Sequence, residues 1–133
     1  PSLTEENNLT HLFAKTVSLF PDKVAVICED QKITFKELDR ESTLLAKYLV
    51  SKYKIKPNTF VAFFADKNIE MMIALLAILK AGCAFIPIDA SCPLDRVNFI
   101  VKDGKCDLIC VSPEKQTLIL DCPQVHVMQR HVE

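Results

Sequence analysis

The chain has 133 residues, 50% of them hydrophobic and 25% charged, which is the size and composition of one globular domain. Its 16 basic and 17 acidic residues leave a formal net charge of −1, so neither nucleic acid nor an anionic membrane is expected as a partner. The longest apolar run, residues 71–79, has about half the length of a membrane-spanning helix. The N-terminus also lacks the basic and apolar regions of a secretory signal.

The first predicted element is an amphipathic helix from its cap Asn8 to Phe20, because apolar residues recur there at three- and four-residue spacing and Pro21 ends the pattern. Two β-type runs follow, residues 24–28 and 32–35. The three residues between them predict a hairpin, although none of them is the glycine that such turns prefer.

Thr34 and Glu37 have the spacing of a capping box, so a second helix is predicted to begin at Phe35. Its apolar face is assigned to Leu38, Leu45, Tyr48 and Leu49. Three lysines crowd its end, at positions 52, 54 and 56. They could meet a phosphate or an acidic partner, but a solvated helix end is the favoured interpretation because acidic residues are plentiful in the same chain.

Residues 60–64 form a continuous apolar run, which is typical of a strand covered on both faces of a parallel sheet. The helix predicted over residues 69–79 is apolar at nearly every position and should be buried almost all round. Its cap is either Asp66 or Asn68. Gly82 is expected just beyond the helix end, where a left-handed backbone is needed, and residues 84–88 form the next strand. This order is a βαβ unit with parallel strands and a right-handed crossover.

The pattern then repeats. Pro93 is expected in the first turn of a helix that ends near Gly104, and a strand follows at residues 107–111. Residues 112–120 are expected to form a short helix or turn, and 124–128 a last strand. The fold class is therefore α/β, a mostly parallel sheet with flanking helices plus an N-terminal helix and β-hairpin. We treat residues 1–133 as one unit, the incomplete N-terminal portion of a larger subdomain.

The six cysteines stand at positions 28, 83, 92, 106, 110 and 122. A disulfide framework is one interpretation of this number. Cys28, Cys83 and Cys110, however, lie within apolar runs, where free cysteine behaves as a small hydrophobic residue. A chain of this length also needs no cross-links to bury a core. We therefore expect reduced thiols and a cytoplasmic protein.

Cys106, Cys110, His126 and His131 have a spacing found in two-cysteine, two-histidine zinc sites. Such a finger requires the cysteines on a hairpin and both histidines on one helix face. Cys110 instead lies in an apolar strand, and the residues around His126 alternate like a strand. Zinc-dependent nucleic-acid binding therefore remains a weak alternative, and no metal ligand is assigned.

Asp89 follows a predicted parallel strand, at the edge where α/β proteins place functional groups. A turn residue is the favoured interpretation, because aspartate is common in turns. Arg96 could pair with Asp89, as a structural contact. The chain has only two glycines, Gly82 and Gly104, which stand apart and therefore provide no glycine-rich loop for a triphosphate. No catalytic or cofactor-binding residue is assigned, and the residues of any substrate site are unknown.

Residues 33–38 read Ile-Thr-Phe-Lys-Glu-Leu and resemble Leu-Thr-Tyr-x-Glu-Leu, the first core motif of the adenylate-forming enzymes. Residues 79–89 read Leu-Lys-Ala-Gly-Cys-Ala-Phe-Ile-Pro-Ile-Asp and resemble the second, Leu-Lys-Ala-Gly-x-Ala-Tyr-Leu/Val-Pro-Ile/Leu-Asp. Residues 93–96 continue it as Pro-x-x-Arg, and residues 20–26 resemble the family's entry into its first hairpin. The pattern is most similar to the amino-acid adenylation domains of nonribosomal peptide synthetases. Phenylalanines 35 and 85 replace two tyrosines, which removes hydroxyls and keeps the rings.

This resemblance implies an ATP- and Mg²⁺-dependent ligase that activates a carboxylic acid as its acyl adenylate and transfers it to the thiol of a phosphopantetheine carrier. The implied partners are the remainder of the adenylation domain and a carrier domain. The family's phosphate loop, substrate pocket and catalytic lysine lie further along the family's sequence, so this segment alone is expected to be inactive. Six motif residues are interpreted as scaffold: Thr34, Glu37, Lys80, Gly82, Pro87 and Asp89. Two alternatives remain open, a non-enzymatic α/β interaction module and part of an acyl-CoA synthetase.

Overall fold

The computed structural model describes residues 8–66, 68–112 and 122–126. In chain order its elements are α1 (Leu9–Leu19), β1 (Val24–Cys28), β2 (Gln31–Thr34), α2 (Phe35–Tyr53), β3 (Phe60–Phe64), α3 (Ile69–Lys80), β4 (Ala84–Ile88), α4 (Leu94–Asp103), β5 (Cys106–Val111) and β6 (Gln124–His126). The expected α/β architecture is confirmed. Among the described residues, no helix is long and apolar enough to cross a bilayer.

Within the described residues, four parallel strands form the main sheet, in the order β4-β3-β5-β6. Phe64 at the end of β3 is level with Ile88 on β4 and Val111 on β5, so these strands end together at one edge. The register shifts at the start of β5, where Phe60 pairs with Cys106 but Val61 pairs with Leu108. This β-bulge inserts one extra residue into β5 and reverses the side chains that precede it.

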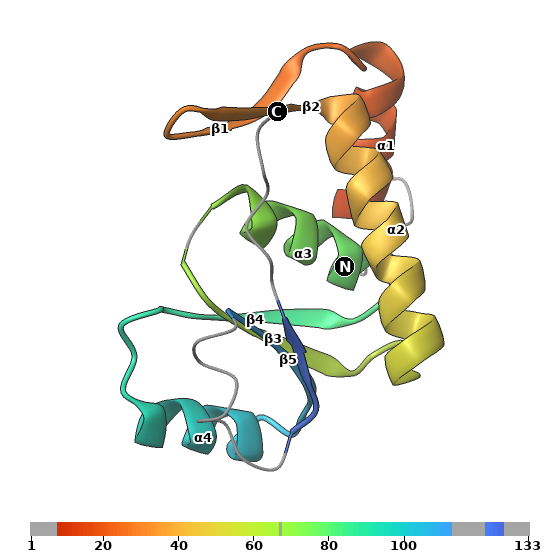
Figure 1. Cartoon of the computed structure of the whole chain (residues 1–133). Helices are drawn as coiled ribbons and strands as arrows, with labels where there is room; N and C mark the ends of the chain where they lie inside the picture. The colour runs from red at the N-terminus through yellow and green to blue at the C-terminus, as the bar shows by residue number, and fades with distance from the viewer. Residues whose placement is uncertain (1–7, 67, 113–121, 127–133) are drawn as a thin grey trace.

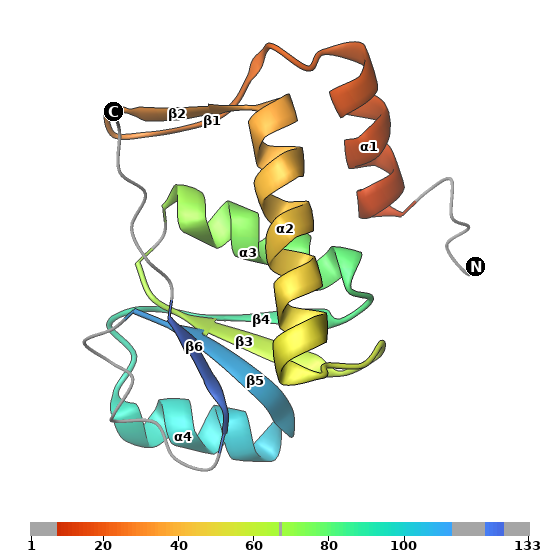
Figure 2. The same cartoon turned by 45° about the vertical axis from the view of Figure 1, so that its right-hand side comes forward.

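Helices cover both faces of this sheet, as Figures 1 and 2 show. On one face, Phe63 and Leu108 pack with Leu49 of α2 and Ile78 of α3. On the other face, the side chains of Phe64 and Ile109 join residues of α4. The helix α3 has no exposed residue, which confirms that it is buried almost all round. A two-faced core of this kind explains why β3 and β5 read as continuous apolar runs.

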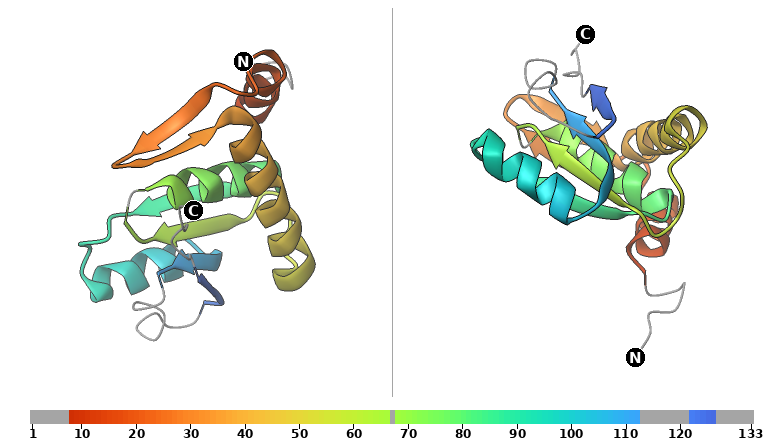
Figure 3. Two further views of the ribbon diagram at one scale, coloured as in Figure 1. Left: turned by 45° about the horizontal axis from the view of Figure 1, so that its top comes forward. Right: turned by 90° about the horizontal axis from the view of Figure 1, so that it is seen from below.

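The hairpin of β1 and β2 forms a separate antiparallel sheet on the side of α3 away from the main sheet (Figures 1 and 3). Ile33 of the hairpin is fully buried and packs in a third cluster with Leu38, Ile69 and Ile73. The turn has no glycine, and Glu29 instead takes a left-handed backbone with φ of 56°. The helix α1 packs beside α2 and has no buried residue.

The predicted helix starts are confirmed. The side chains of Asn8, Thr34 and Asn68 each accept a hydrogen bond from a backbone N–H in the first turn of α1, α2 and α3. Asn68 is therefore the cap of α3, and Asp66 is not. Pro93 lies one position earlier than expected, since it is the N-terminal cap of α4 and not part of its first turn.

The assignment of Tyr48 to the apolar face of α2 is wrong, because 42% of this residue is exposed. The ordinary helical period puts it at the border of that face, and Leu49 takes the buried position. The strand expected at 107–111 begins at Cys106. The helix or turn expected at 112–120 and the end of the last expected strand fall at least partly outside the described residues, so they stay predictions.

Candidate functional site

Lys80, the last residue of α3, is the centre of a polar cluster that joins α3 to α2. Its Nζ donates hydrogen bonds to the Asp39 carbonyl (3.0 Å), Asp39 Oδ1 (2.7 Å), Ser42 Oγ (2.8 Å) and Thr43 Oγ1 (2.8 Å). Only 18% of the lysine side chain is exposed, while Ser42 is fully buried. The ammonium group is therefore fully engaged within the protein, and it has a structural role.

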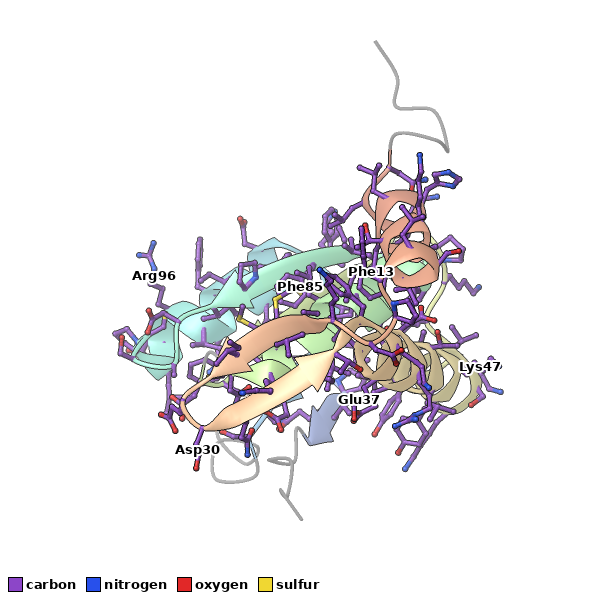
Figure 4. The ribbon with its side chains drawn as sticks, turned by 90° about the horizontal axis from the view of Figure 1, so that it is seen from above. Phe13, Asp30, Glu37, Lys47, Phe85 and Arg96 are labelled. Atoms are coloured by element: carbon purple, nitrogen blue, oxygen red, sulfur yellow. The ribbon has the colours of Figure 1, made fainter. Side chains whose placement is uncertain are left out.

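The same lysine also contacts α1, because its Nζ lies 5.4 Å from the centre of the Phe13 ring. Phe13 in turn packs against Phe35, with ring centres 6.3 Å apart. Figure 4 shows Phe13 on the inner side of α1. Lys80 therefore holds together the last turn of α3, the first half of α2 and the middle of α1.

Sequence reasoning missed Asp39, Ser42 and Thr43 as partners of Lys80. A usable signal was present, since Ser42 follows Leu38 by four residues and therefore lies on the buried face of α2. A serine in that position needs a hydrogen-bond partner, and Lys80 provides it.

Gly82 makes the turn from α3 into β4 with a left-handed φ of +80°, as predicted. Its carbonyl accepts a hydrogen bond from the Asn58 N–H at 2.8 Å, which ties this turn to the segment entering β3. A Cβ built on Gly82 would lie 3.3 Å from the Pro57 Cβ. Both the backbone conformation and the close approach to Pro57 therefore favour glycine.

Thr34 and Glu37 form the predicted capping box of α2. The Glu37 N–H donates to Thr34 Oγ1 at 3.2 Å, and the Thr34 N–H donates to Glu37 Oε1 at 2.9 Å. Two backbone amides that the helix itself leaves unpaired are satisfied in this way. Pro87 lies in β4, which pairs only with β3 in the described sheet, and an edge position is where a strand tolerates proline.

Asp89 lies at the carboxyl edge of the sheet, directly after β4. Its Oδ1 accepts hydrogen bonds from Ser91 N–H (2.8 Å) and Ser91 Oγ (2.7 Å), which is the geometry of an Asx turn. Arg96 is exposed on α4. The geometry therefore gives Asp89 the turn role that the sequence favoured.

The two phenylalanines at tyrosine positions of the motifs are both packed against aromatic rings. Phe85 lies 6.0 Å from Phe63, centre to centre, and Phe35 contacts Phe13 as described above. The structure therefore keeps the aromatic packing that a tyrosine would make.

Cys106 and Cys110 cannot form the cysteine pair of a zinc site, because they lie in the cores on opposite faces of the sheet. The β-bulge between them causes this separation. Burial raises the pKa of the Cys110 and Cys122 thiols to about 12, so both stay protonated at neutral pH. All six cysteines are free. His131 lies outside the described residues.

Neither glycine belongs to a phosphate-binding loop. Gly82 leaves α3, and Gly104 is the C-terminal cap of α4. The sequence contains no third glycine. Neither position therefore provides the converging backbone amides of a glycine-rich phosphate loop. The two motif segments instead build the helix and strand junctions of the scaffold.

Comparison with known proteins gives the family. The profile described as AMP-binding enzyme matches residues 13–132. Bacitracin synthase 2 of Bacillus licheniformis is 38% identical over 108 residues, which are 81% of this chain and 4% of the synthase. Tyrocidine synthase 1 of Brevibacillus parabrevis is 33% identical over 114 residues, 86% of this chain and 10% of the synthase. The chain thus spans a small part of these relatives.

Solved structures agree on the fold. The N-terminal subdomain of NpsA from Klebsiella oxytoca, in complex with 3-hydroxyanthranilyl-AMSN, has a TM-score of 0.79 at 21% identity, over 90% of this chain and 30% of that one. The O-succinylbenzoate coenzyme A synthetase of Bacillus subtilis, in complex with AMP, has a TM-score of 0.79 at 20% identity, over 86% of this chain and 30% of that one. Sequence and fold together place this chain in the family of AMP-binding, adenylate-forming enzymes.

Proposed function

We propose that this chain is the N-terminal segment of an enzyme that activates an amino acid as its acyl adenylate and passes it to a carrier thiol. In the complete enzyme, the substrate carboxylate attacks the α-phosphorus of ATP, and pyrophosphate leaves. The carrier thiol then attacks the acyl carbon, and AMP leaves. The six free thiols and the need for ATP favour the cytoplasm as the location.

The observation that carries this proposal is the match of residues 13–132 to the AMP-binding enzyme family. The amino-acid class is supported by a relative from Penicillium chrysogenum, N-(5-amino-5-carboxypentanoyl)-L-cysteinyl-D-valine synthase, which is 38% identical over 104 residues. The name of this synthase contains amino-acid units. That alignment covers 78% of this chain and 3% of the synthase.

No step of this reaction is assigned to residues of the chain. Lys80, Thr34 and Glu37 are bonded within the scaffold, and Asp89 holds a turn. Their proposed contribution is to fix the helices and the parallel sheet on which the remainder of the domain is built. ATP and Mg²⁺ are proposed to bind residues outside this segment, which is the reason that the segment alone should be inactive.

The proposal is tested by product analysis with the complete enzyme. Purified protein is incubated with ATP, Mg²⁺ and panels of amino, fatty and aryl acids, and AMP and pyrophosphate are quantified. The expected result is acid-dependent formation of both products with one or a few amino acids. Release of ADP and phosphate, or activity confined to fatty or aryl acids, would overturn the proposed chemistry or substrate class respectively.

The carrier is tested separately, by adding a phosphopantetheine-loaded carrier domain of the same protein and following thioester formation by mass spectrometry. A carrier whose attachment serine is replaced by alanine is the matched control. We expect the amino-acyl group on the loaded carrier and none on the control. Adenylate formation without any transfer to the loaded carrier would contradict the proposed partner.

A further inference from the structure

The outward face of α2 has one stripe of exposed side chains, which we call the outer stripe. Its members recur every three or four residues and so lie on neighbouring positions of one side of the helix. They are Arg40, Leu44, Lys47, Tyr48, Ser51 and Lys52. Figure 2 shows α2 crossing α3 and reaching down to the sheet, and Figure 4 shows Lys47 pointing away from the protein.

The outer stripe is basic although the whole chain carries a net charge of −1. Residues 42–65 contain four lysines and no acidic residue. The three acidic residues of α2, Glu37, Asp39 and Glu41, lie in its first half, where Glu37 belongs to the capping box, Asp39 binds Lys80 and Glu41 is partly buried. Within the described residues, neither Lys47 nor Lys52 forms an ion pair. Neither charge is therefore neutralised by a carboxylate of the described chain.

Large apolar side chains interrupt these charges. Leu44 is 60% exposed and Tyr48 is 42% exposed. Solvated lysines alone would not require these apolar side chains. A surface that alternates cations with exposed apolar and aromatic groups has the composition of a protein-binding site rather than of a purely solvated helix end.

Part of the outer stripe is held in a fixed arrangement. The Lys52 Nζ lies 5.4 Å from the ring centre of Tyr48 and 5.6 Å from that of Tyr53. The two rings meet edge to face at 5.9 Å. Tyr53 is in turn anchored to the sheet, because its hydroxyl donates to the Gln124 carbonyl at 3.4 Å. Such pre-organisation lowers the entropy cost of binding.

We propose that the outer stripe of α2 docks an acidic amphipathic helix of a partner protein. Its carboxylates pair with Arg40, Lys47 and Lys52, and its apolar residues cover Leu44 and Tyr48. A helix matches the stripe because both repeat at three- and four-residue spacing. An extended polyanion would satisfy the cations but would leave the apolar residues exposed to water.

The test uses the complete protein and a fluorescein-labelled amphipathic helical peptide with a glutamate-rich face and a leucine face. Binding is followed by fluorescence anisotropy at physiological salt. We expect saturable binding that weakens by about tenfold or more in the double variant Lys47→Glu/Lys52→Glu. Leu44→Ser, which changes no charge, should also weaken it. Thermal unfolding verifies that each variant is folded, and single Lys47→Glu replaces the double variant if the latter is not.

The matched control is Lys15→Glu/Lys32→Glu, which makes the same charge change at two exposed lysines of α1 and β2. It should leave binding within about twofold of the unmodified protein, because these lysines lie outside the stripe. The proposal is overturned by absence of saturable binding or by equal loss in the control. It is also overturned if Leu44→Ser binds normally, or if heparin binds the stripe as tightly as the peptide.

Discussion

Lys80 and Asp39 form a salt bridge of 2.7 Å between Nζ and Oδ1, across 41 positions of the chain. The bridge joins the C-terminal end of α3 to the first half of α2. Because the same ammonium also binds the buried Ser42 hydroxyl, the bond network fixes how the two helices pack. This lysine of the second motif therefore has a structural role.

Replacing Lys80 by methionine should lower the free energy of unfolding by about 1–3 kcal/mol, because the Ser42 hydroxyl loses its cationic partner inside the protein. The partly exposed Asp39 carboxylate can turn to water, so its loss contributes little. Urea denaturation of the complete enzyme measures the effect. Lys47→Met, at an exposed site of the same chain, should change stability by less than about 0.5 kcal/mol. Equal stability of Lys80→Met and the unmodified protein would show that the cluster does not stabilise the fold.

Gly82 should tolerate asparagine better than valine. Both side chains meet Pro57, but asparagine adopts the left-handed backbone far more readily than a β-branched residue does. We expect Gly82→Val to lower stability by about 2 kcal/mol or more and Gly82→Asn by clearly less. Thermal unfolding of the two variants gives the comparison, and an unchanged midpoint for Gly82→Val would contradict the geometric reasoning.

The capping box can be tested by keeping or removing one hydroxyl. Thr34→Val removes the acceptor for the Glu37 N–H and should cost about 1 kcal/mol, whereas Thr34→Ser retains the acceptor and should cost much less. Chemical denaturation of both variants measures the difference. If serine and valine are equally destabilising, lost methyl packing rather than the cap is the cause.

The buried thiol of Cys110 predicts a pH effect. Its pKa is about 12 in the folded protein and near the ordinary 9.0 when unfolded. Between these values the unfolded chain binds fewer protons, so the free energy of unfolding falls as pH rises. The contribution is fully present below about pH 9 and is lost toward pH 12. Cys110→Ala should be less stable than the unmodified protein at all pH values, because the substitution leaves a cavity. Its free energy of unfolding should, however, fall less steeply above pH 9 than that of the unmodified protein. If the free energies of unfolding of the two proteins fall in parallel above pH 9, the Cys110 thiol is not the cause of the decline.

Much of the fold could be predicted because local signals agree with tertiary packing. Asn8 and Thr34 begin their helices where their side chains cap them, and the apolar run at 60–64 becomes the central strand β3. Gly82 also takes the left-handed turn expected of it. In each case the determining interaction lies within a few residues of the chain.

The rest depended on contacts between distant residues. The partners of Lys80 lie in α2, and no local pattern states how α2 and α3 cross. The β-bulge that puts Cys106 and Cys110 on opposite faces is set by pairing with β3, and no pattern within β5 itself signals it. Tyr48 was misplaced because it lies at the border of the apolar face, beside the buried Leu49, where the apolar pattern alone does not separate exposed from buried positions.

We propose that residues 1–133 are scaffold and that the reaction takes place elsewhere in the domain. This division is tested most directly by exchange of labelled pyrophosphate into ATP, measured for residues 1–133 alone and for the complete adenylation domain. The complete domain should catalyse exchange that depends on its cognate carboxylic acid, while the isolated segment should show none, because its glycines and motif residues are committed to the fold. Acid-dependent exchange by residues 1–133 alone would contradict this division, and so would a complete domain that is inactive with every acid tested.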